Sequence, residues 1–569
     1  MTLSKSLLRV IILLSCLAFG FAGQKGKIAG NISDSKTGEG LIGVNIIVDE
    51  LGIGATTNLD GHYFILNIAP GIYTVRYLMI GYTPIIVEGV EIAMDQTTHL
   101  DHKMSQEVLG LDEVRVVATR PVVVKDLSAS QLYVKEKAIK ELPVANISSV
   151  VGLQAGVEGV SIRGGSSAQT AFIVDGFQLN DGRSNLPTLS LSLSSVKEIQ
   201  VQSGGFNAEY GNIRSGIVNV VTAEGNKDRY TGSLTYYHTP AAPKHFGISP
   251  YDKDSYYLRP YLDDAVAWTG TQGESYEDLN SNREWDPGEP FDDYNKDGDW
   301  TGWDDYTKQQ YATFEGWNAY SLTTLQDEDP SNDLSPSGAQ REFIWKHRRT
   351  GFINDPDYTL DFGLGGPVPG LSSLGEPRFY LSHQSGKSNF VVPLSRDAYL
   401  SNTTRLKFNA DVSKNIKLTM TMQYSEDKSV SPYSWTTTPT GSVLSSIYSV
   451  AGLVKGGSNI LFMPGYYSPA DIYRTNFGLK LNHMLDEHSY YEVMYQYLRS
   501  KYWTFETDAR DPQLIEIYDG VWRDEAPYGY DGGEWMNLGR DSSLIQTHSL
   551  KADYTRQVNT RNQLKTGIR

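Results

Sequence analysis

The sequence predicts a mainly β protein in three parts: a small N-terminal β-sandwich, an α+β domain, and part of an antiparallel transmembrane β-barrel. Three observations support this fold class. Residues 27–104 alternate like short strands joined by tight turns, and residues 153–222 hold a series of short strands that end in Gly or Asp-Gly. From Arg229 onward, apolar and polar residues alternate strictly, which is typical of strands with two different faces.

Residues 1–22 are predicted to be a signal peptide for the Sec pathway. Lys5 and Arg9 lead into the apolar run from Val10 to Ala18, and small residues follow before Gly23. This run is too short for a spanning helix, and the sequence has no other apolar stretch of about 18 residues, so a membrane span would have to be built from strands. The single cysteine, Cys16, lies in this segment, so no disulfide is expected in the mature chain.

The composition excludes some partners. A net charge of -17 argues against binding to nucleic acid. Much of this charge is concentrated in residues 251–305, which hold 16 Asp and Glu against 4 Lys and Arg. The 36 tyrosines and 10 tryptophans are typical of β proteins and of the aromatic belts of membrane barrels.

Residues 26–104 are predicted to form the β-sandwich. Its motifs run from Gly30 through Thr56-Thr57-Asn58-Leu59-Asp60-Gly61 to Pro70-Gly71-Ile72-Tyr73. This order resembles the carboxypeptidase regulatory-like domain, a transthyretin-like sandwich often found ahead of the plug in outer-membrane receptors. Zinc carboxypeptidases need a His-x-x-Glu pair, and none of the ten histidines has Glu three residues on, so peptidase activity is not expected.

Residues 105–120 form the predicted linker, which ends in a β-branched stretch. This stretch resembles the TonB box, an extended segment that pairs edge-on with the periplasmic TonB protein. Arg115 departs from the aliphatic pattern of such boxes, and a first strand of the next domain or a plain linker remain alternatives. The box candidate comprises Leu111, Asp112, Glu113, Val114, Arg115, Val116 and Val117.

Residues 121–225 are predicted to form the α+β domain. The order of its Gly-anchored strands resembles the plug domain of TonB-dependent outer-membrane receptors, whereas a soluble α+β domain with glycines at turns is the alternative. The resemblance implies that charged motif residues such as Arg163 and Asp175 are buried and pair with a surrounding barrel, which is a structural role. The motif residues are Arg163, Gly164, Gly165, Asp175, Gly176, Glu209, Tyr210 and Gly211.

Residues 227–569 are predicted to form the N-terminal part of an outer-membrane barrel. Short polar turns at 413–415, 485–487 and 558–561 alternate with long loops, which is the signature of such barrels. Plugged receptors close with 22 strands, so this chain, which ends within a strand, is expected to be a fragment. The nine candidate strands lie near residues 230–237, 359–365, 378–385, 406–412, 416–424, 477–481, 491–497, 550–554 and 564–568.

The long loop at residues 239–357 contains two carboxylate-rich repeats offset by 15 residues. Each repeat places oxygen-bearing side chains at positions 1, 3, 5, 7, 9 and 12 of a calcium loop, which predicts structural Ca²⁺. Arg283 stands where Gly is usual, Asp304 stands where Glu is usual, and a solvated acidic loop is the alternative. The candidate ligands are Asp278, Asn280, Asn282, Glu284, Asp286 and Glu289 in the first repeat, and Asp293, Asn295, Asp297, Asp299, Thr301 and Asp304 in the second.

These resemblances imply energised uptake of an unidentified solute across the outer membrane. The expected partners are the TonB-ExbB-ExbD complex, outer-membrane lipid and a surface lipoprotein lid of the kind that works with glycan importers. The sequence shows no nucleophile and base pair, phosphate loop or zinc set, so no enzyme activity is expected. The alternative is a non-transporting, calcium-dependent surface receptor or adhesin on the same scaffold.

Overall fold

A computed structural model of the chain describes residues 25–569 with internal gaps. The signal-peptide prediction lies outside the described residues. The gaps are residues 95, 107–113, 118–130, 145, 189, 205–212, 245–246, 250, 256–257, 272–273, 294–297, 301, 303–313, 331–332, 347–352, 372–374, 432–442, 446–466, 506–514, 519–520, 525–539 and 560–561.

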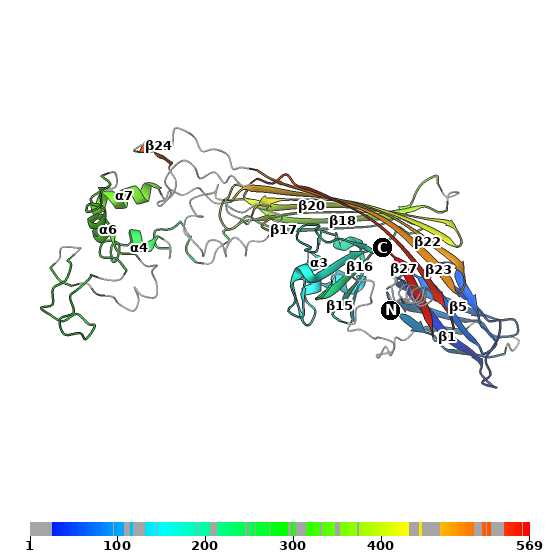
Figure 1. Cartoon of the computed structure of the whole chain (residues 1–569). Helices are drawn as coiled ribbons and strands as arrows, with labels where there is room; N and C mark the ends of the chain where they lie inside the picture. Colours follow the sequence, from blue (N-terminus) through cyan, green and yellow to red (C-terminus); the bar gives the residue numbers. More distant parts are fainter. Residues whose placement is uncertain are drawn as a thin grey trace, which may run out of the picture.

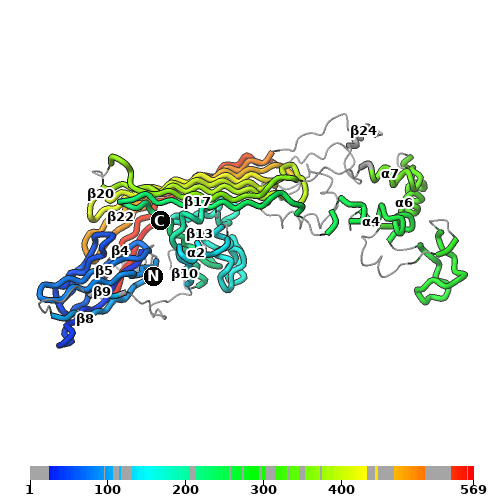
Figure 2. The backbone as a smooth tube through the Cα atoms, turned by 180° about the vertical axis from the view of Figure 1, so that it is seen from behind, coloured from blue at the N-terminus to red at the C-terminus, as the bar shows by residue number. Residues whose placement is uncertain are grey.

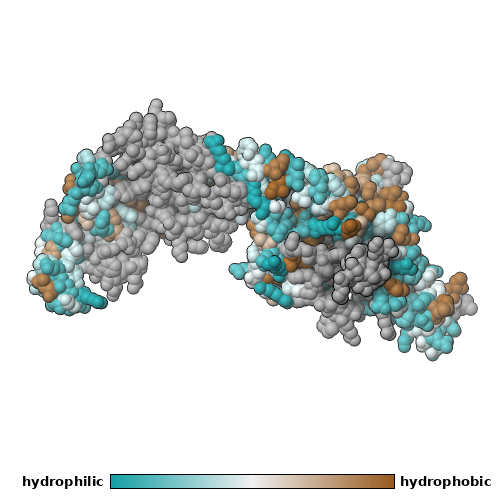
Figure 3. Space-filling model, in the orientation of Figure 1, coloured by the Kyte–Doolittle hydropathy of each residue, from teal (hydrophilic) through white to brown (hydrophobic). Residues whose placement is uncertain are grey.

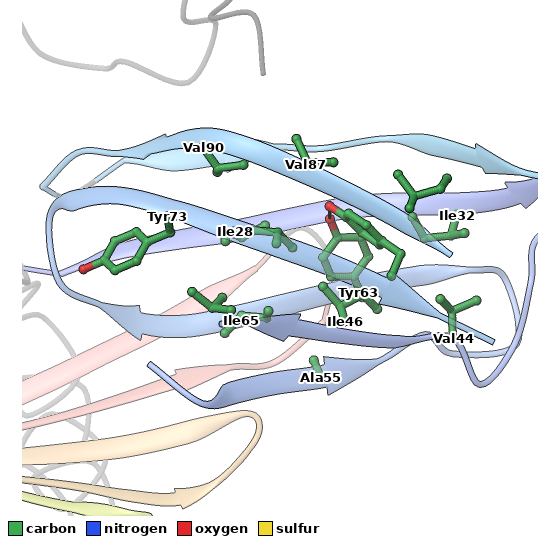
Figure 4. Packing of buried hydrophobic residues seen from close by; sticks show 14 of the residues in the cluster. Ile28, Ile32, Val44, Ile46, Ala55, Tyr63, Ile65, Tyr73, Val87 and Val90 are labelled. Atoms are coloured by element: carbon green, nitrogen blue, oxygen red, sulfur yellow. Dashed lines mark hydrogen bonds between the residues drawn. The ribbon is translucent and has the colours of Figure 1, made fainter. Parts of the chain in front are cut away.

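The N-terminal domain is a β-sandwich with an apolar core between its sheets. Figure 4 shows side chains such as Ile28, Ile46 and Tyr63 packed together in this core. The hydroxyl groups of Tyr63 and Tyr77 lie 2.9 Å apart, which satisfies two buried polar groups at once. One sheet contains β1 (Gly26–Asp34), β4 (His62–Ile68), β7 (Thr97–His99) and β8 (His102–Met104). The other has the order β3 (Ile53–Thr56), β2 (Asn45–Val48), β5 (Gly71–Leu78), β6 (Ile85–Ile92), β9 (Val114–Val117).

The second domain, whose described strands lie between residues 131 and 222, is an α+β domain with a main sheet of five strands; because it corresponds to the predicted plug, we refer to it as the plug. Asp175 and Gly176 form the two-residue turn between β13 (Thr170–Val174) and β14 (Phe177–Gln178), with φ values of 52° and 94°. Two positive φ angles in succession define the turn for which Asp-Gly is favoured, so this predicted turn is confirmed. The sheet order is β10 (Gln131–Lys135), β15 (Val196–Gln202), β16 (Gly216–Thr222), β13 (Thr170–Val174), β14 (Phe177–Gln178). The remaining elements are α2 (Glu136–Glu141), α3 (Ile147–Gly152), the hairpin β11 (Val157–Glu158) and β12 (Ser161–Ile162), and the 3-10 turns at Ser167–Gln169 and Leu193–Ser195.

A nine-stranded antiparallel meander follows the plug, and each strand pairs with the next in sequence. All nine strands expected from periodicity are present, so the fold class is confirmed. The curved sheet passes over the plug (Figure 1), and in its described part β17 (Thr231–Thr239) and β27 (Gln563–Ile568) are the two edges. The strands are β17 (Thr231–Thr239), β18 (Asp357–Pro367), β19 (Arg378–Asn389), β20 (Ala398–Ser413), β21 (Ile416–Val430), β22 (Pro469–Asp486), β23 (Ser489–Thr504), β26 (Leu544–Gln557) and β27 (Gln563–Ile568).

The two faces of the meander differ in chemistry. Lys407, Asn409 and Thr421 are almost completely buried on the face toward the plug, whereas Met422 and Tyr424 are exposed. Apolar side chains gather over part of the sheet in Figure 3. The predicted alternation of polar inside and apolar outside is therefore confirmed, and it suits a sheet with lipid on one side. Among the described residues, no helix is long and apolar enough to span a membrane.

The long connection between β17 and β18 carries its own packed core at the end of the sheet away from the N-terminal domain (Figures 1 and 2). Trp317 and Phe343 are buried there and pack against Phe390 from the β19–β20 connection. The loop is thus a folded cap, which was not expected from its polar composition. Its helices are α4 (Arg259–Leu262), α6 (Trp317–Thr324) and α7 (Pro336–Lys346). A separate hairpin, β24 (Ile515–Tyr518) and β25 (Val521–Asp524), lies in the β23–β26 connection.

Candidate functional site

The plug is held against the sheet by buried ion pairs, and the central one involves Asp175. Its carboxylate oxygens lie 2.7 Å from Arg405 Nη2 and 3.1 Å from Lys407 Nζ, both on β20. The backbone N–H of Thr222 donates to the same carboxylate at 3.0 Å. Burial alone would raise the pKa of Asp175, but the charges of Lys407 and Arg405 outweigh it and hold this pKa well below its usual range. The predicted pairing of Asp175 with the barrel wall is observed.

A second set of contacts joins the plug to later strands. The Tyr502 hydroxyl donates to the carboxylate of Asp181 at 2.6 Å. Arg183 lies 2.6 Å from Asp541 and its guanidinium group stacks 3.9 Å from the centre of the Tyr502 ring. On β18, Asp361 accepts hydrogen bonds from the side chain of Ser192 and the backbone N–H of Leu193, at 2.8 and 2.9 Å.

Glu224, just after the last plug strand, forms a third contact near the short turns of the sheet. Its carboxylate lies 2.6 Å from Lys417, 3.5 Å from Arg378 and 3.7 Å from Lys407. Burial opposes ionisation, but Lys417 and the other cations lower the pKa of Glu224 well below its usual value. Because Lys407 contacts both Glu224 and Asp175, the two plug carboxylates are joined through one cation.

The other plug motif residues have different roles. Arg163 is exposed, so the expected burial of its charge is wrong. It lies in a tight turn with φ of 52°, followed by Gly164 at 73°. Gly165 leaves no room for a side chain, because a Cβ atom there would lie 2.5 Å from Ser215 Oγ. The last motif, at residues 209–211, lies outside the described residues.

Sequence reasoning did not single out Arg405, Lys407, Asp181 or Glu224. A signal existed for the two cations, because both stand at inward positions of a strand that otherwise alternates Leu, Phe and Ala with polar residues. No comparable periodic signal marks the plug loops that contain Asp181 and Arg183, or the connection that contains Asp541.

The box candidate is only partly described, and its described part belongs to the sandwich. Val114–Val117 forms β9, which pairs in parallel with Ile85–Glu88 of β6 at the edge of the sheet. The side chains of Arg115 and Val116 are exposed, and Arg115 Nη1 lies 3.2 Å from Glu88 Oε1. Residues 111–113 lie outside the described residues.

The first carboxylate-rich repeat forms a compact loop. The amide nitrogens of Asn280 and Asn282 donate to one oxygen of Asp286 at 2.7 and 2.8 Å. The backbone N–H of Arg283, at position 6, donates to Asp278 at 2.8 Å. The matching N–H of Gly298 in the second repeat donates to Asp293 at 3.0 Å, and both position-6 residues have positive φ, at 65° and 84°. The two loops therefore share the turn that a calcium loop requires at this position.

The two repeats also pack against each other with approximate twofold symmetry. Tyr276 and Phe291, which are 15 residues apart, form an antiparallel bridge. Trp285 and Trp300 stack at 5.2 Å with an interplanar angle of 17°. Trp285 donates to the carbonyl of Glu289, and Trp300 donates to the equivalent carbonyl of Glu274.

The described residues contain no group of three or more His, Cys, Asp or Glu side chains arranged to hold a metal ion. In the first repeat, both carboxylate oxygens of Glu289 accept backbone N–H groups, from Leu279 and Asp286. Of the remaining candidate ligands, Asn295, Asp297, Thr301 and Asp304 lie outside the described residues.

Comparison with known proteins accounts for the two N-terminal domains. Residues 28–116 match the CarboxypepD_reg-like domain, and residues 123–218 match the TonB-dependent Receptor Plug Domain. The first match extends into β9. The chain is 24% identical over 250 residues to the TonB-dependent transporter Oar of Myxococcus xanthus, a match covering 40% of this chain and 23% of Oar.

In these two domains the chain is similar to TonB-dependent receptors. It is also 27% identical over 247 residues to the TonB-dependent receptor SusC of Bacteroides thetaiotaomicron, covering 40% of this chain and 23% of SusC. The matched region thus spans about a quarter of each curated relative. This homology supports the predicted location in the outer membrane.

Among solved structures, the chain is similar to the siderophore receptor PirA of Acinetobacter baumannii. The two share 12% sequence identity with a TM-score of 0.39, over 75% of this chain and 45% of that structure.

Proposed function

We propose that the protein is a TonB-dependent outer-membrane transporter that takes up a solute not yet identified. One observation carries this proposal: the plug lies on the polar face of the strand meander and is fixed there by buried pairs such as Asp175 with Arg405 and Lys407. A plug held by ionic contacts can rearrange, because water can hydrate the charged groups once they separate. Water cannot replace the contacts of an apolar core in this way. The domain match and the two relatives support the same function.

The proposed energy source is the TonB-ExbB-ExbD complex, which would engage the segment around Val114–Val117. A strand that lies at the edge of a sheet offers backbone groups to a partner strand, which is the chemistry of β-augmentation. Outer-membrane lipid would contact the exposed apolar face of the meander, and a surface lipoprotein lid remains a further proposed partner. The comparisons support a transporter and give no support to the adhesin alternative.

Calcium remains part of the proposal as a structural ion in the cap. The support is the ligand spacing in both repeats, the positive φ at position 6 of each, and the packing of the repeats as a pair. The ion would stiffen the long connection between β17 and β18 and has no proposed part in moving solute.

Depletion of the growth medium tests the proposed function even while the solute is unidentified. Cells that express the full-length wild-type protein, Val116→Pro or Val116→Thr are grown in one defined medium, and the spent medium is compared by mass spectrometry. Proline removes a backbone donor and fixes φ, whereas threonine keeps both the N–H group and the β-branched shape. We expect at least one solute to be depleted by wild type and Val116→Thr but not by Val116→Pro. Identical depletion in all three strains would contradict energised uptake through this segment.

A further inference from the structure

We infer that the N-terminal sandwich is a removable latch, which must undock from the plug and the sheet before the plug can rearrange. This inference rests on the proposed function and adds a step to it. The evidence comes from how the sandwich is built, what it contacts, and where β9 lies within it.

The sandwich has an apolar core of its own. Its core lies between its own two sheets and includes fully buried residues such as Ile28, Ile46 and Val75. Such a domain can leave its docking surface without exposing its core to water, so the cost of undocking is limited to the contacts at the interface.

The contact with the plug centres on Met94, which lies two residues after the end of β6 and is fully buried. Its backbone N–H donates to Glu198 Oε1 at 3.1 Å, and its carbonyl accepts from the Tyr133 hydroxyl at 3.2 Å. Asn219 Nδ2 lies 2.9 Å from its sulfur. Three strands of the plug sheet, β10, β15 and β16, therefore hold one residue of the sandwich.

The contact with the meander lies near its short turns and is mainly polar. Asn67 and Asn482 exchange two amide hydrogen bonds, at 2.6 and 3.0 Å. Phe64 packs edge-on against His488 at 5.0 Å. A cavity of about 530 Å³, lined by residues such as Leu66, Asn67 and Asn482, lies along this seam. Polar contacts beside a cavity are typical of interfaces that open, rather than of permanent ones.

The pairing of β9 attaches the box candidate to the sandwich. Val116 of β9 pairs with Val87 of β6, and β6 leads directly to Met94 in the plug. A pull on β9 is carried first by its pairing with β6, and therefore by the sandwich, before it passes along the chain through residues 118–130 to plug strand β10. The sandwich, which Met94 joins to the plug, therefore takes the load before the plug does.

Cysteine reactivity in cells tests this order of events. The 569-residue sequence has one cysteine, Cys16, in the predicted signal peptide. Single-cysteine variants of the full-length protein are made in a background in which every cysteine outside these 569 residues is replaced by serine. Asn482→Cys reports on the seam between sandwich and sheet, and Ser192→Cys reports on the seam between plug and sheet, where Ser192 bonds Asp361. Thr56→Cys, on the exposed face of the sandwich, is the matched control. Each variant is alkylated with N-ethylmaleimide in energised cells and in cells treated with a protonophore.

We expect energisation to raise the alkylation rate of Asn482→Cys and Ser192→Cys by about tenfold or more, as for local opening of a protected site, and to leave Thr56→Cys unchanged. Adding Val116→Pro should abolish both responses. If Ser192→Cys responds while Asn482→Cys does not, the plug moves without undocking of the sandwich and the latch is overturned, although the proposed function stands. If neither responds, energy coupling itself fails and the latch fails with it.

Discussion

The carboxylate of Asp175, in a plug turn, lies 2.7 Å from the guanidinium group of Arg405, which is 230 positions later on the wall of the sheet. Both side chains are almost completely buried, at 6% and 2% exposure. Removal of one charge from a buried pair leaves its partners unpaired, and this loss typically costs about 3–5 kcal/mol.

Asp175→Asn should therefore weaken docking of the plug while the strands remain intact. The expected result is faster protease cleavage within the plug of the purified full-length protein, with the meander protected as in wild type. Asp228→Asn, at an exposed position beside the first strand, is the control and should behave like wild type. Equal cleavage of the Asp175 and Asp228 variants would show that the pair does not hold the plug.

The pair of Arg183 and Asp541 predicts a specific dependence on pH. Burial would raise the pKa of Asp541, but hydrogen bonds from Arg183 and Ser543 outweigh it and lower this pKa from 3.8 to about 2. A carboxyl group whose pKa is lower in the folded state than in the unfolded state stabilises the fold at pH values above its unfolded-state pKa. This stabilisation is lost as the pH falls through the folded-state pKa. Stability from this pair should be constant above pH of about 5 and decline between about 4 and 2.

Asp541→Asn provides the comparison for that pH profile, because asparagine does not titrate. Thermal unfolding of both proteins in detergent should differ at neutral pH and converge as the pH approaches 2. A difference in thermal stability that stays constant down to that pH would mean that Arg183 does not lower the pKa of Asp541 in the folded protein.

The two-faced meander predicts heat-modifiable migration on gels. The full-length protein, extracted from outer membranes with detergent, should run as a compact species when unheated and as an unfolded chain after boiling, because a closed strand barrel resists detergent. Recovery in the soluble periplasmic fraction would overturn the membrane assignment. Met422→Asp, on the exposed apolar face, should reduce insertion by placing a charge in lipid, whereas Thr421→Ser on the inward face should insert normally.

The paired carboxylate repeats predict calcium binding. Titration of the full-length protein with Ca²⁺ should give binding in the micromolar to millimolar range of sensor and extracellular sites, and Mg²⁺ should bind more weakly. The double variant Asp278→Ala/Asp293→Ala should lose this binding, because both changes remove position 1 of a loop. Asp252→Ala/Asp254→Ala, two exposed acids outside the repeats, should retain it. Equal Ca²⁺ binding by both double variants would show that the ion binds through the overall negative charge of the cap and not at the two repeats.

Much of this architecture follows from sequence because its strands have two chemically distinct faces. Alternation around Lys407 and Asn409 defines both the strand and the inward side, and an Asp-Gly pair defines the turn at Asp175. Contacts across long separations could not be predicted in this way. The partner of Asp175 depends on how the plug packs against β20. The parallel pairing of β9 with β6 could not be predicted either, because a strand of four residues is too short to show a sequence period. The core around Trp317 was missed because its apolar residues are scattered through an acidic loop.

The exchange symmetry of the two 15-residue repeats has an evolutionary consequence. Equivalent residues contact one another: Tyr276 bridges Phe291, Trp285 stacks on Trp300, and each tryptophan caps the carbonyl at the matching place. A single copy would leave one indole face uncovered and one backbone segment without its bridge partner, and tandem duplication supplies both in one genetic event. A loop can therefore gain an ordered module through copying of a short segment, without any compensating change in the strands that carry it.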